Sequence, residues 1–181
     1  MDTSSELLAI AIGKVIGGGR GVPYEAVSLC QINGRVEQYS IAVSPAAFTW
    51  SATRMPDGGT DSFDPNTLTI RAADGHDRVL TLDRVPRLFP ESVQLAFPLS
   101  LPIWGRHMDQ YHPVAAEDRG TYTTLLLRHR EDPRIFGSFT FETRSGVGTS
   151  LVLPTYALKL EREPEPEPGE HDFGFVAGHK S

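Results

Sequence analysis

The side chains best suited to chemistry gather in one stretch of the chain, residues 101–120. His107, Asp109 and His112 lie close together there. An imidazole changes its charge near neutral pH, and a neighbouring carboxylate can hold its tautomer and raise its basicity. We therefore predict that His107 or His112 acts as an acid–base group and that Asp109 orients it. A hydrogen-bonded surface loop is the alternative interpretation of the same residues.

Aromatic and cationic residues accompany these groups. Trp104 and Tyr111 could stack on a planar ligand, and Arg106 could bind an anionic group. Alternation along the next strand places His129 on an apolar face, where a polar ring needs a partner or an opening to water. The residues predicted to contact a ligand are Trp50, Trp104, Arg106, Tyr111 and His129.

Five aromatic residues lie in or near segments that the sequence predicts to be long loops: Phe48, Trp50, Phe63, Trp104 and Tyr111. Rings gathered at one end of a β scaffold can line a ligand site. They can equally fill the open end of the core, which is the common fate of large side chains.

The same region does not predict a metal site. Zinc sites are typically marked by cysteine pairs or by two histidines one helical turn apart, and the sequence has neither. Pro113 disfavours a helix around His112, which removes the geometric reason for the histidine spacing to matter. We predict no metal and no cofactor.

Composition narrows the class of protein. The chain has 181 residues and a net charge of −6, and its last 21 positions carry most of the acidic excess. No basic stripe indicates a nucleic-acid partner, and no segment approaches the roughly 20 apolar residues that span a bilayer. Cys30 is the single cysteine, so an intrachain disulfide is excluded and a reducing, cytoplasmic location is predicted.

Alternating apolar and polar residues predict β-hairpins. The first joins residues 25–32 to 35–43 across Asn33 and Gly34. We favour a bulged three-residue turn, which sets Val27 beside Tyr39, over a strict two-residue turn. The second hairpin joins residues 67–72 to 78–85, with Ile70 facing Leu80.

The third hairpin joins residues 121–129 to 135–143, with Leu127 opposite Gly137 and Leu125 opposite Phe139. Residues 93–101 alternate strictly and predict a further strand. Residues 151–160 change parity around Pro154, as a bent strand would. Together these segments predict an all-β fold, a single antiparallel β-barrel or β-sandwich of about seven to nine strands.

Three regions are predicted along the chain. Residues 1–21 form a short helix or lid with a glycine-rich hinge, although the alternation of Leu8, Ile10 and Ile12 would also suit a strand. Residues 22–160 form the antiparallel β domain. Residues 161–181 form an extended acidic tail rich in proline and glutamate.

Two functions follow from these features. The leading hypothesis is a β domain that encloses a small apolar or aromatic molecule beneath residues 101–120. If it is an enzyme, its few polar groups suit a cofactor-free isomerase, cyclase or lyase. The alternative is a non-enzymatic assembly or adaptor module that acts through edge strands and its C-terminal tail, and such a module could be a homo-oligomer.

Overall fold

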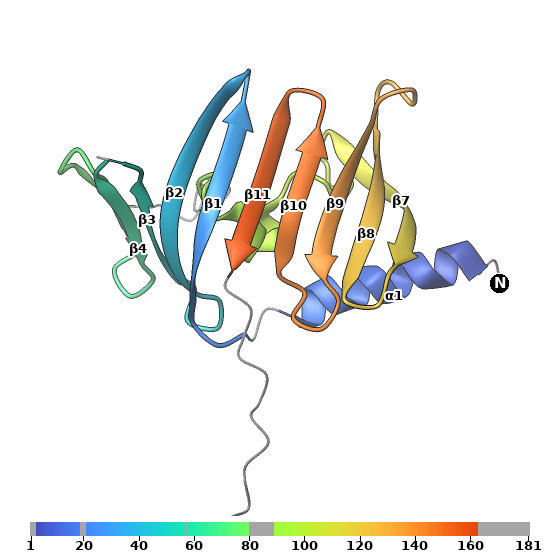
Figure 1. The fold of residues 1–181 in the computed structure, drawn as a ribbon, viewed down its shortest axis with the longest axis horizontal. Coiled ribbons are helices and arrows are strands. Elements are labelled where there is room, and N and C mark those ends of the chain that lie inside the picture. The colour runs from blue at the N-terminus through green and yellow to red at the C-terminus, as the bar shows by residue number, and fades with distance from the viewer. Residues whose placement is uncertain (1–2, 19–20, 57, 80–88, 163–181) are drawn as a thin grey trace, which may run out of the picture.

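The computed structural model describes residues 3–18, 21–56, 58–79 and 89–162. These residues form one α-helix, α1 (Thr3–Gly17), two short 3-10 helices and a single antiparallel sheet of 11 strands (Figure 1). The strands are β1 (Tyr24–Ile32), β2 (Arg35–Ser44), β3 (Thr49–Arg54), β4 (Thr60–Asp64), β5 (Thr69–Arg71), β6 (Asp77–Val79), β7 (Tyr111–Asp118), β8 (Tyr122–His129), β9 (Phe136–Glu142), β10 (Gly148–Leu153) and β11 (Tyr156–Arg162).

The strand order across the sheet is β6-β5-β4-β3-β2-β1-β11-β10-β9-β8-β7. Strands β1 to β6 form one meander and β7 to β11 a second, and the two meet where β1 pairs with β11. The all-β, antiparallel prediction is confirmed. The finer prediction of a closed barrel or a sandwich of seven to nine strands is not, because the described sheet has 11 strands and ends at β6 and β7 without closing.

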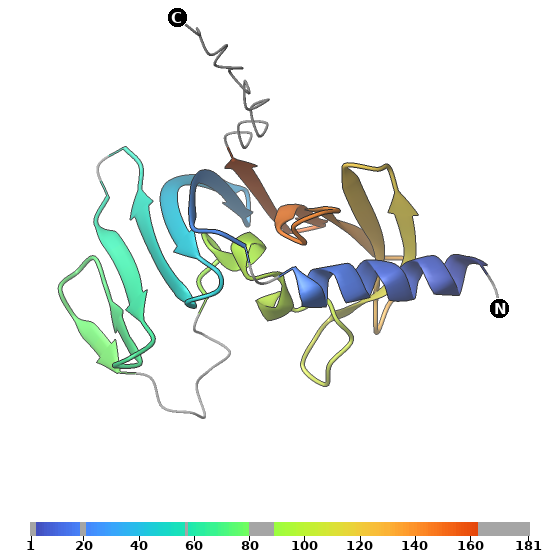
Figure 2. The ribbon, with the colours of Figure 1, turned by 90° about the horizontal axis from the view of Figure 1, so that it is seen from below.

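One face of the sheet is covered (Figure 2). Helix α1 packs against β7 and β8, and the 3-10 helices η2 (Gln94–Ala96) and η3 (Pro98–Ser100) lie beside it, η2 against β10 and β11. The largest fully buried side chains come from both layers: Phe139, Phe141, Ile41, Leu95, Leu101, Ile103, Leu125, Leu127, Leu151, Leu158, Val15 and Val93. Side chains of α1 and of residues 93–103 therefore fill the core together with those of the sheet. We call the covered side of the sheet its inner face.

Helix α1 reaches the sheet through a close backbone contact at its end. A Cβ on Gly18 would lie 2.1 Å from the Ser145 carbonyl oxygen, and one on Gly146 would lie 2.8 Å from the Lys14 carbonyl oxygen. Only glycine allows this approach. At the flank of the helix, Lys14 Nζ donates to Asp118 Oδ2 at 3.1 Å.

The third predicted hairpin is confirmed to the residue: Leu127 pairs with Gly137 and Leu125 with Phe139. The first is wrong in its turn, because Ile32 pairs with Arg35 around a two-residue turn. Asn33 and Gly34 both have positive φ, the geometry that matches the twist of hairpin strands. The bulged turn was favoured because it sets apolar Val27 beside Tyr39, but Val27 lies on the outer face and is only half-buried.

The second hairpin keeps its predicted faces but shifts its register, since Ile70 pairs with Arg78. Its predicted residues 80–85 lie outside the described part of the chain.

Two predicted strands have a different structure. Residues 93–101 form η2 and η3, the second of which begins at Pro98, and Val93, Leu95 and Leu101 are nonetheless fully buried. Residues 151–160 are not one bent strand but parts of the β10–β11 hairpin. Pro154 lies in its turn, which explains the change of parity.

Candidate functional site

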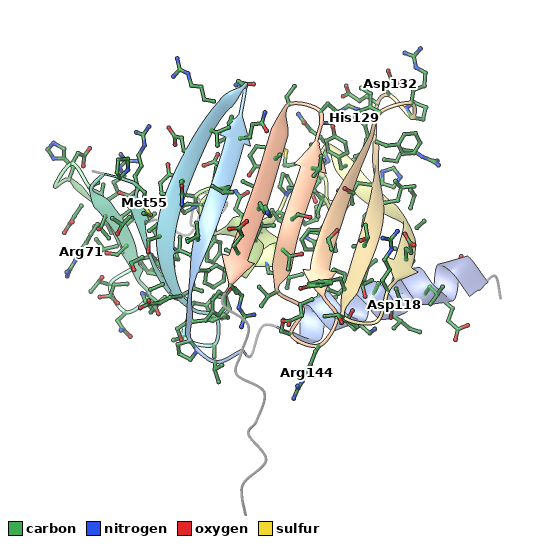
Figure 3. All side chains as sticks on the ribbon, viewed as in Figure 1. Met55, Arg71, Asp118, His129, Asp132 and Arg144 are labelled. Atoms are coloured by element: carbon green, nitrogen blue, oxygen red, sulfur yellow. The ribbon has the colours of Figure 1, made fainter. Side chains whose placement is uncertain are left out.

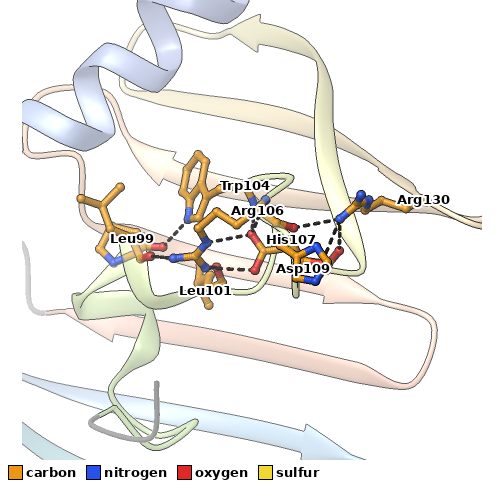
Figure 4. Close-up of polar contacts among 8 residues, drawn as sticks. Leu99, Leu101, Trp104, Arg106, His107, Asp109 and Arg130 are labelled. Carbon is orange, nitrogen blue, oxygen red and sulfur yellow. Dashed lines mark hydrogen bonds and ion pairs between the residues drawn. The ribbon is translucent and has the colours of Figure 1, made fainter. Parts of the chain in front are cut away.

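The predicted catalytic carboxylate has a structural role. Asp109 is almost fully buried, and its Oδ2 accepts hydrogen bonds from the backbone nitrogens of Trp104 and Arg106 at 3.0 and 3.1 Å (Figure 4). The Arg106 guanidinium forms an ion pair with the same carboxylate, with its Nε 2.9 Å from Oδ2 and an Nη 3.1 Å from Oδ1. These donors occupy both carboxylate oxygens, and none of them belongs to a histidine.

The Arg106 side chain is likewise engaged in hydrogen bonds within its own segment. Besides Asp109, its guanidinium donates to the carbonyl oxygens of Leu99 at 3.0 Å and Leu101 at 2.6 Å. Arg130 then donates to the carbonyl oxygens of Arg106 at 2.9 Å and His107 at 3.2 Å (Figure 4). This polar network fastens the loop between η3 and β7, and it leaves Arg106 few donors for an external anion.

The three histidines that we predicted to be site residues lie in different surroundings. His107 lies exposed on the tight turn between Arg106 and Asp109. His112 lies half-buried on β7, opposite Arg128. His129 ends β8 at the opposite end of the sheet from Asp118 (Figure 3). The hydrogen bonds of the described residues link neither His107 nor His112 to Asp109.

His129 caps a turn. Its Nδ1 accepts hydrogen bonds from the backbone nitrogens of Glu131 at 3.3 Å and Asp132 at 3.1 Å. Its ring meets Tyr111 edge to face, with centroids 5.0 Å apart. The imidazole therefore finds its polar partners within its own hairpin.

The five aromatic residues predicted to lie in or near long loops differ in their burial. Trp50, Phe63 and Tyr111 are buried in the core, and Trp104 is half-buried against Phe139. Phe48 differs, because its side chain is 57% exposed. Four of the five rings thus fill the core, and Phe48 is the ring that remains available at the surface.

Phe48 also has an unusual backbone. Its φ is +55°, a left-handed conformation that costs a side chain with a Cβ roughly 1 kcal/mol. Its ring stacks on Phe97 at 6.3 Å, and Phe97 stacks on Phe89 at 4.3 Å. Sequence reasoning could place Phe48 near a turn, but nothing in the sequence signals the positive φ or the exposure.

Two hollows lie on the meander β1 to β6, away from the histidines. A trough of about 610 Å³ is lined by Pro23, Tyr24, Glu25, Ala42, Val43, Ser44, Thr49, Trp50 and Ser51. Its strand residues Glu25, Ala42 and Ser51 alternate with the buried Val43 and Trp50, so these side chains lie on the outer face. Ser44 and Thr49 flank the turn that carries Phe48.

The second hollow, of about 280 Å³, lies on the inner face and is lined by Trp50, Asp61, Ile70, Ala72, Ala73, Asp74, Arg78 and Pro90. Of the predicted site residues, Trp50 alone lines these two hollows. Its buried indole nitrogen has no hydrogen-bond partner in the described part of the chain.

The single cysteine is poorly suited to nucleophilic chemistry in this fold. Burial raises the pKa of the Cys30 thiol to about 11, so the thiolate needed for nucleophilic attack is scarce at neutral pH. Among the described residues, no group of three or more His, Cys, Asp or Glu side chains is arranged to hold a metal ion. No described helix has the length and apolarity to traverse a bilayer.

No protein-family model and no curated protein matches the chain. Among solved structures, MucB in complex with MucA(peri) is 14% identical with a TM-score of 0.43, covering 88% of this chain and 57% of MucB. An uncharacterized conserved protein from Thermus thermophilus is 7% identical with a TM-score of 0.43, covering 88% and 90% of the two chains. A DUF1329 family protein from Desulfovibrio piger is 11% identical with a TM-score of 0.34, covering 93% and 95%.

The chain thus spans less than two thirds of the length of MucB. These TM-scores lie below 0.5, and we base no functional conclusion on them.

Proposed function

We propose that this protein is a non-enzymatic binding module that docks a segment of another protein at the Phe48 turn, from which the outer trough begins at Ser44 and Thr49. The observation that carries this proposal is the exposed, left-handed Phe48. Its ring stacks on the buried Phe97, which in turn stacks on Phe89, while Phe48 as a residue remains 57% exposed. Rigid exposed aromatic rings are typical anchors of protein interfaces.

The trough beside the turn suits a peptide. The hydroxyl groups of Ser44, Thr49 and Ser51 and the carboxylate of Glu25 can bond to backbone groups of an extended segment. The small side chain of Ala42 lets such a segment approach the sheet. Covering the exposed part of Phe48 would remove roughly 100 Å² of apolar surface from water, which is worth about 2 kcal/mol of binding free energy.

An isomerase or cyclase finds less support. Asp109 and Arg106 are engaged with each other and with the backbone of their own loop, and His107 lies apart in solvent. A general base must reach its substrate within a shaped site. Neither hollow described above is lined by these residues.

The test separates binding from folding at Phe48. Asparagine tolerates the left-handed conformation. Phe48→Asn therefore relieves backbone strain, which stabilises the fold, but it also removes the contact with Phe97, which destabilises it. We expect the free energy of unfolding to change by less than about 1 kcal/mol. Leu68→Asn is the matched control, because Leu68 also has positive φ, +51°, and is 43% exposed, but lies at the β4–β5 turn.

A photo-crosslinking residue at position 48, and at position 68 for comparison, would capture the partner in cells. The captured protein is then purified and its affinity measured by calorimetry. We expect Phe48→Asn to raise Kd about thirtyfold and Leu68→Asn to leave it unchanged. Equal crosslinking at both positions, or equal Kd for both variants, would refute the proposal.

A further inference from the structure

Helix α1 presents an apolar side that the other described residues leave uncovered. Ala11 and Val15 are buried against the sheet, whereas Leu7 and Ile10, which lie three residues apart on another side of the helix, are exposed, Ile10 by 49%. Exposed aliphatic side chains that recur on one helix face indicate a contact surface.

The neighbouring face of the helix, on the other side of Ile10 from Leu7, allows close approach. Ala9, Gly13 and Gly17 follow at intervals of four residues, which places them along one side. A Cβ added to Gly13 or Gly17 would meet nothing within 4 Å. A second helix could therefore lie close to the backbone of α1 at these positions, as small residues allow in other helix pairs.

The N-terminal turns of α1 extend past β7, beyond the edge of the sheet (Figures 1 and 2). A helix of this length is marginal in water unless its apolar face packs against something. The sheet supports the other end, where Val15 is buried and Gly18 meets Ser145. The exposed Leu7 and Ile10 thus lie where support from the chain itself is weakest.

We propose that a second copy of this chain covers this side of α1, in an antiparallel helix pair with its two-fold axis at Ile10. The charged residues of α1 indicate that the partner on this side is a second copy of the chain. Glu6 lies four residues before Ile10 and Lys14 four residues after it, and α1 has no other charged residue. An antiparallel pair therefore sets Glu6 of each copy opposite Lys14 of the other.

The uncharged residues fit the same axis. Leu7 lies three residues before Ile10 and Gly13 three after, so each Leu7 meets the open space over Gly13 of the other copy. Lys14 uses one of its three N–H donors for Asp118, which leaves donors for Glu6. The two helix dipoles also run in opposite directions, which favours the antiparallel pair.

A lipid surface fits this helix less well. Interfacial helices are typically rich in lysine and arginine on their polar face. Helix α1 has Lys14 alone.

The contact is small, so we expect a reversible dimer. A helix of 15 residues is about 22 Å long, and one of its faces offers less than the roughly 800 Å² per partner of a standard interface. Sedimentation equilibrium of the full chain, up to about 300 µM, is the appropriate measurement.

The first test reverses the charges. Glu6→Lys and Lys14→Glu each place like charges across the axis, and each is expected to raise the dimer Kd roughly tenfold. An equimolar mixture of the two variants restores both attractive pairs and is expected to dimerise like the parent chain. A parallel pair, in which Glu6 faces Glu6, would not be weakened by either single substitution, and that result would overturn the proposal.

The second test fills the space over Gly13. Gly13→Gln improves helix propensity and adds a Cβ that meets nothing within 4 Å, so the variant is expected to unfold at a higher temperature while its dimer weakens at least tenfold. Val152→Gln is the control, because Val152 is 51% exposed on the outer face of the sheet. We expect it to leave the dimer unchanged.

Three further results would overturn the proposal: a monomer at about 300 µM, a Gly13→Gln dimer as stable as the parent, or a monomer that co-sediments with phosphatidylcholine or phosphatidylglycerol vesicles. Phe48 lies on the β2–β3 turn and takes no part in this contact. The two proposals can therefore fail separately. A Phe48→Asn protein that has lost its partner but still dimerises would support the α1 contact alone, and a monomeric protein that still binds its partner would support the Phe48 site alone.

Discussion

Asp109 shows how a single buried carboxylate can organise a loop. It receives hydrogen bonds on both oxygens from Arg106 and from the backbone of residues 104 and 106, and its side chain is only 5% exposed. A buried charge is stable only when its hydrogen bonds are complete. The loop between η3 and β7 is therefore shaped around Asp109.

This role predicts the effect of Asp109→Asn. The amide keeps the shape of the carboxylate but turns one acceptor into a donor that faces the Arg106 guanidinium. We expect the free energy of unfolding to fall by about 2 kcal/mol, since Arg106 stays partly in water and limits the loss. Urea unfolding followed by tryptophan fluorescence measures this change.

Asp132→Asn is the control at the residue scale. Asp132 pairs with Arg134 at 2.9 Å in solvent, and such pairs contribute less than about 1 kcal/mol. If Asp109→Asn were as stable as the parent chain, the carboxylate would be free for the chemistry that the sequence suggested.

The sequence located this loop but not its contacts. Trp104, Arg106, His107, Asp109, Tyr111 and His112 pointed to residues 101–120, and this segment does contain the polar network. The spacing of Arg106 and Asp109 allows a local ion pair, yet the acceptors Leu99 and Leu101 depend on where the chain turns. The exposure of Phe48 depends on its φ, which no side-chain pattern encodes.

Alternation predicted an element correctly where both strands of a hairpin carry it. Leu125 and Leu127 face Phe139 and Gly137 because this register puts the alternating Leu125, Leu127, Phe139 and Phe141 on the buried face. Alternation failed at residues 93–101, where the same side chains are buried from 3-10 turns rather than from a strand. Strand β7 was missed because Pro113 and a bulge between Pro113 and Ala115 break its pattern.

The docking of α1 gives a prediction at the scale of elements. Gly146 has φ of +70° and lies against the Lys14 carbonyl and the Gly18 Cα. Gly146→Ala adds a methyl group to this contact and strains the backbone as well. We expect a loss of about 3 kcal/mol in the free energy of unfolding.

Gly120→Ala is the matched control, because Gly120 has φ of +81° but a Cβ there would meet nothing within 4 Å. It carries the backbone strain alone, about 1 kcal/mol. The difference between the two variants, measured by urea unfolding, is the steric cost at the end of α1. Equal losses would mean that α1 can shift away from the β9–β10 turn without cost.

At the scale of the molecule, the sheet order is the feature that local sequence patterns cannot supply. Ala26 pairs with Arg162 and Ile32 with Tyr156, so the first strand of the sheet lies beside the last. Hairpin signals describe neighbours in the chain, and this pairing joins residues far apart in sequence. The open sheet, rather than a barrel, follows because residues 89–110 and α1 cover the inner face.

This central pairing defines where the domain can be cut. Arg162 is the last residue of β11, its guanidinium lies 4.1 Å from the centroid of the Tyr24 ring, and it pairs with Glu142 at 3.5 Å. A chain ending at Arg162 keeps these contacts, and we expect it to unfold at the same urea concentration as the full chain. A chain ending at Leu160 loses the last two pairs with β1 and the Tyr24 contact, and we expect it to be about 1–2 kcal/mol less stable.

The same two chains separate the routes to assembly. If α1 forms the dimer, residues 1–162 keep the dimer Kd of the full chain in sedimentation equilibrium, because Leu7, Ile10 and Gly13 are all present. If the acidic C-terminal residues hold the copies together, as the adaptor hypothesis from the sequence would have it, the shortened chain sediments as a monomer while remaining folded. That second result would move the contact from the helix to the tail, and the chain ending at Leu160 would then dimerise no better than residues 1–162.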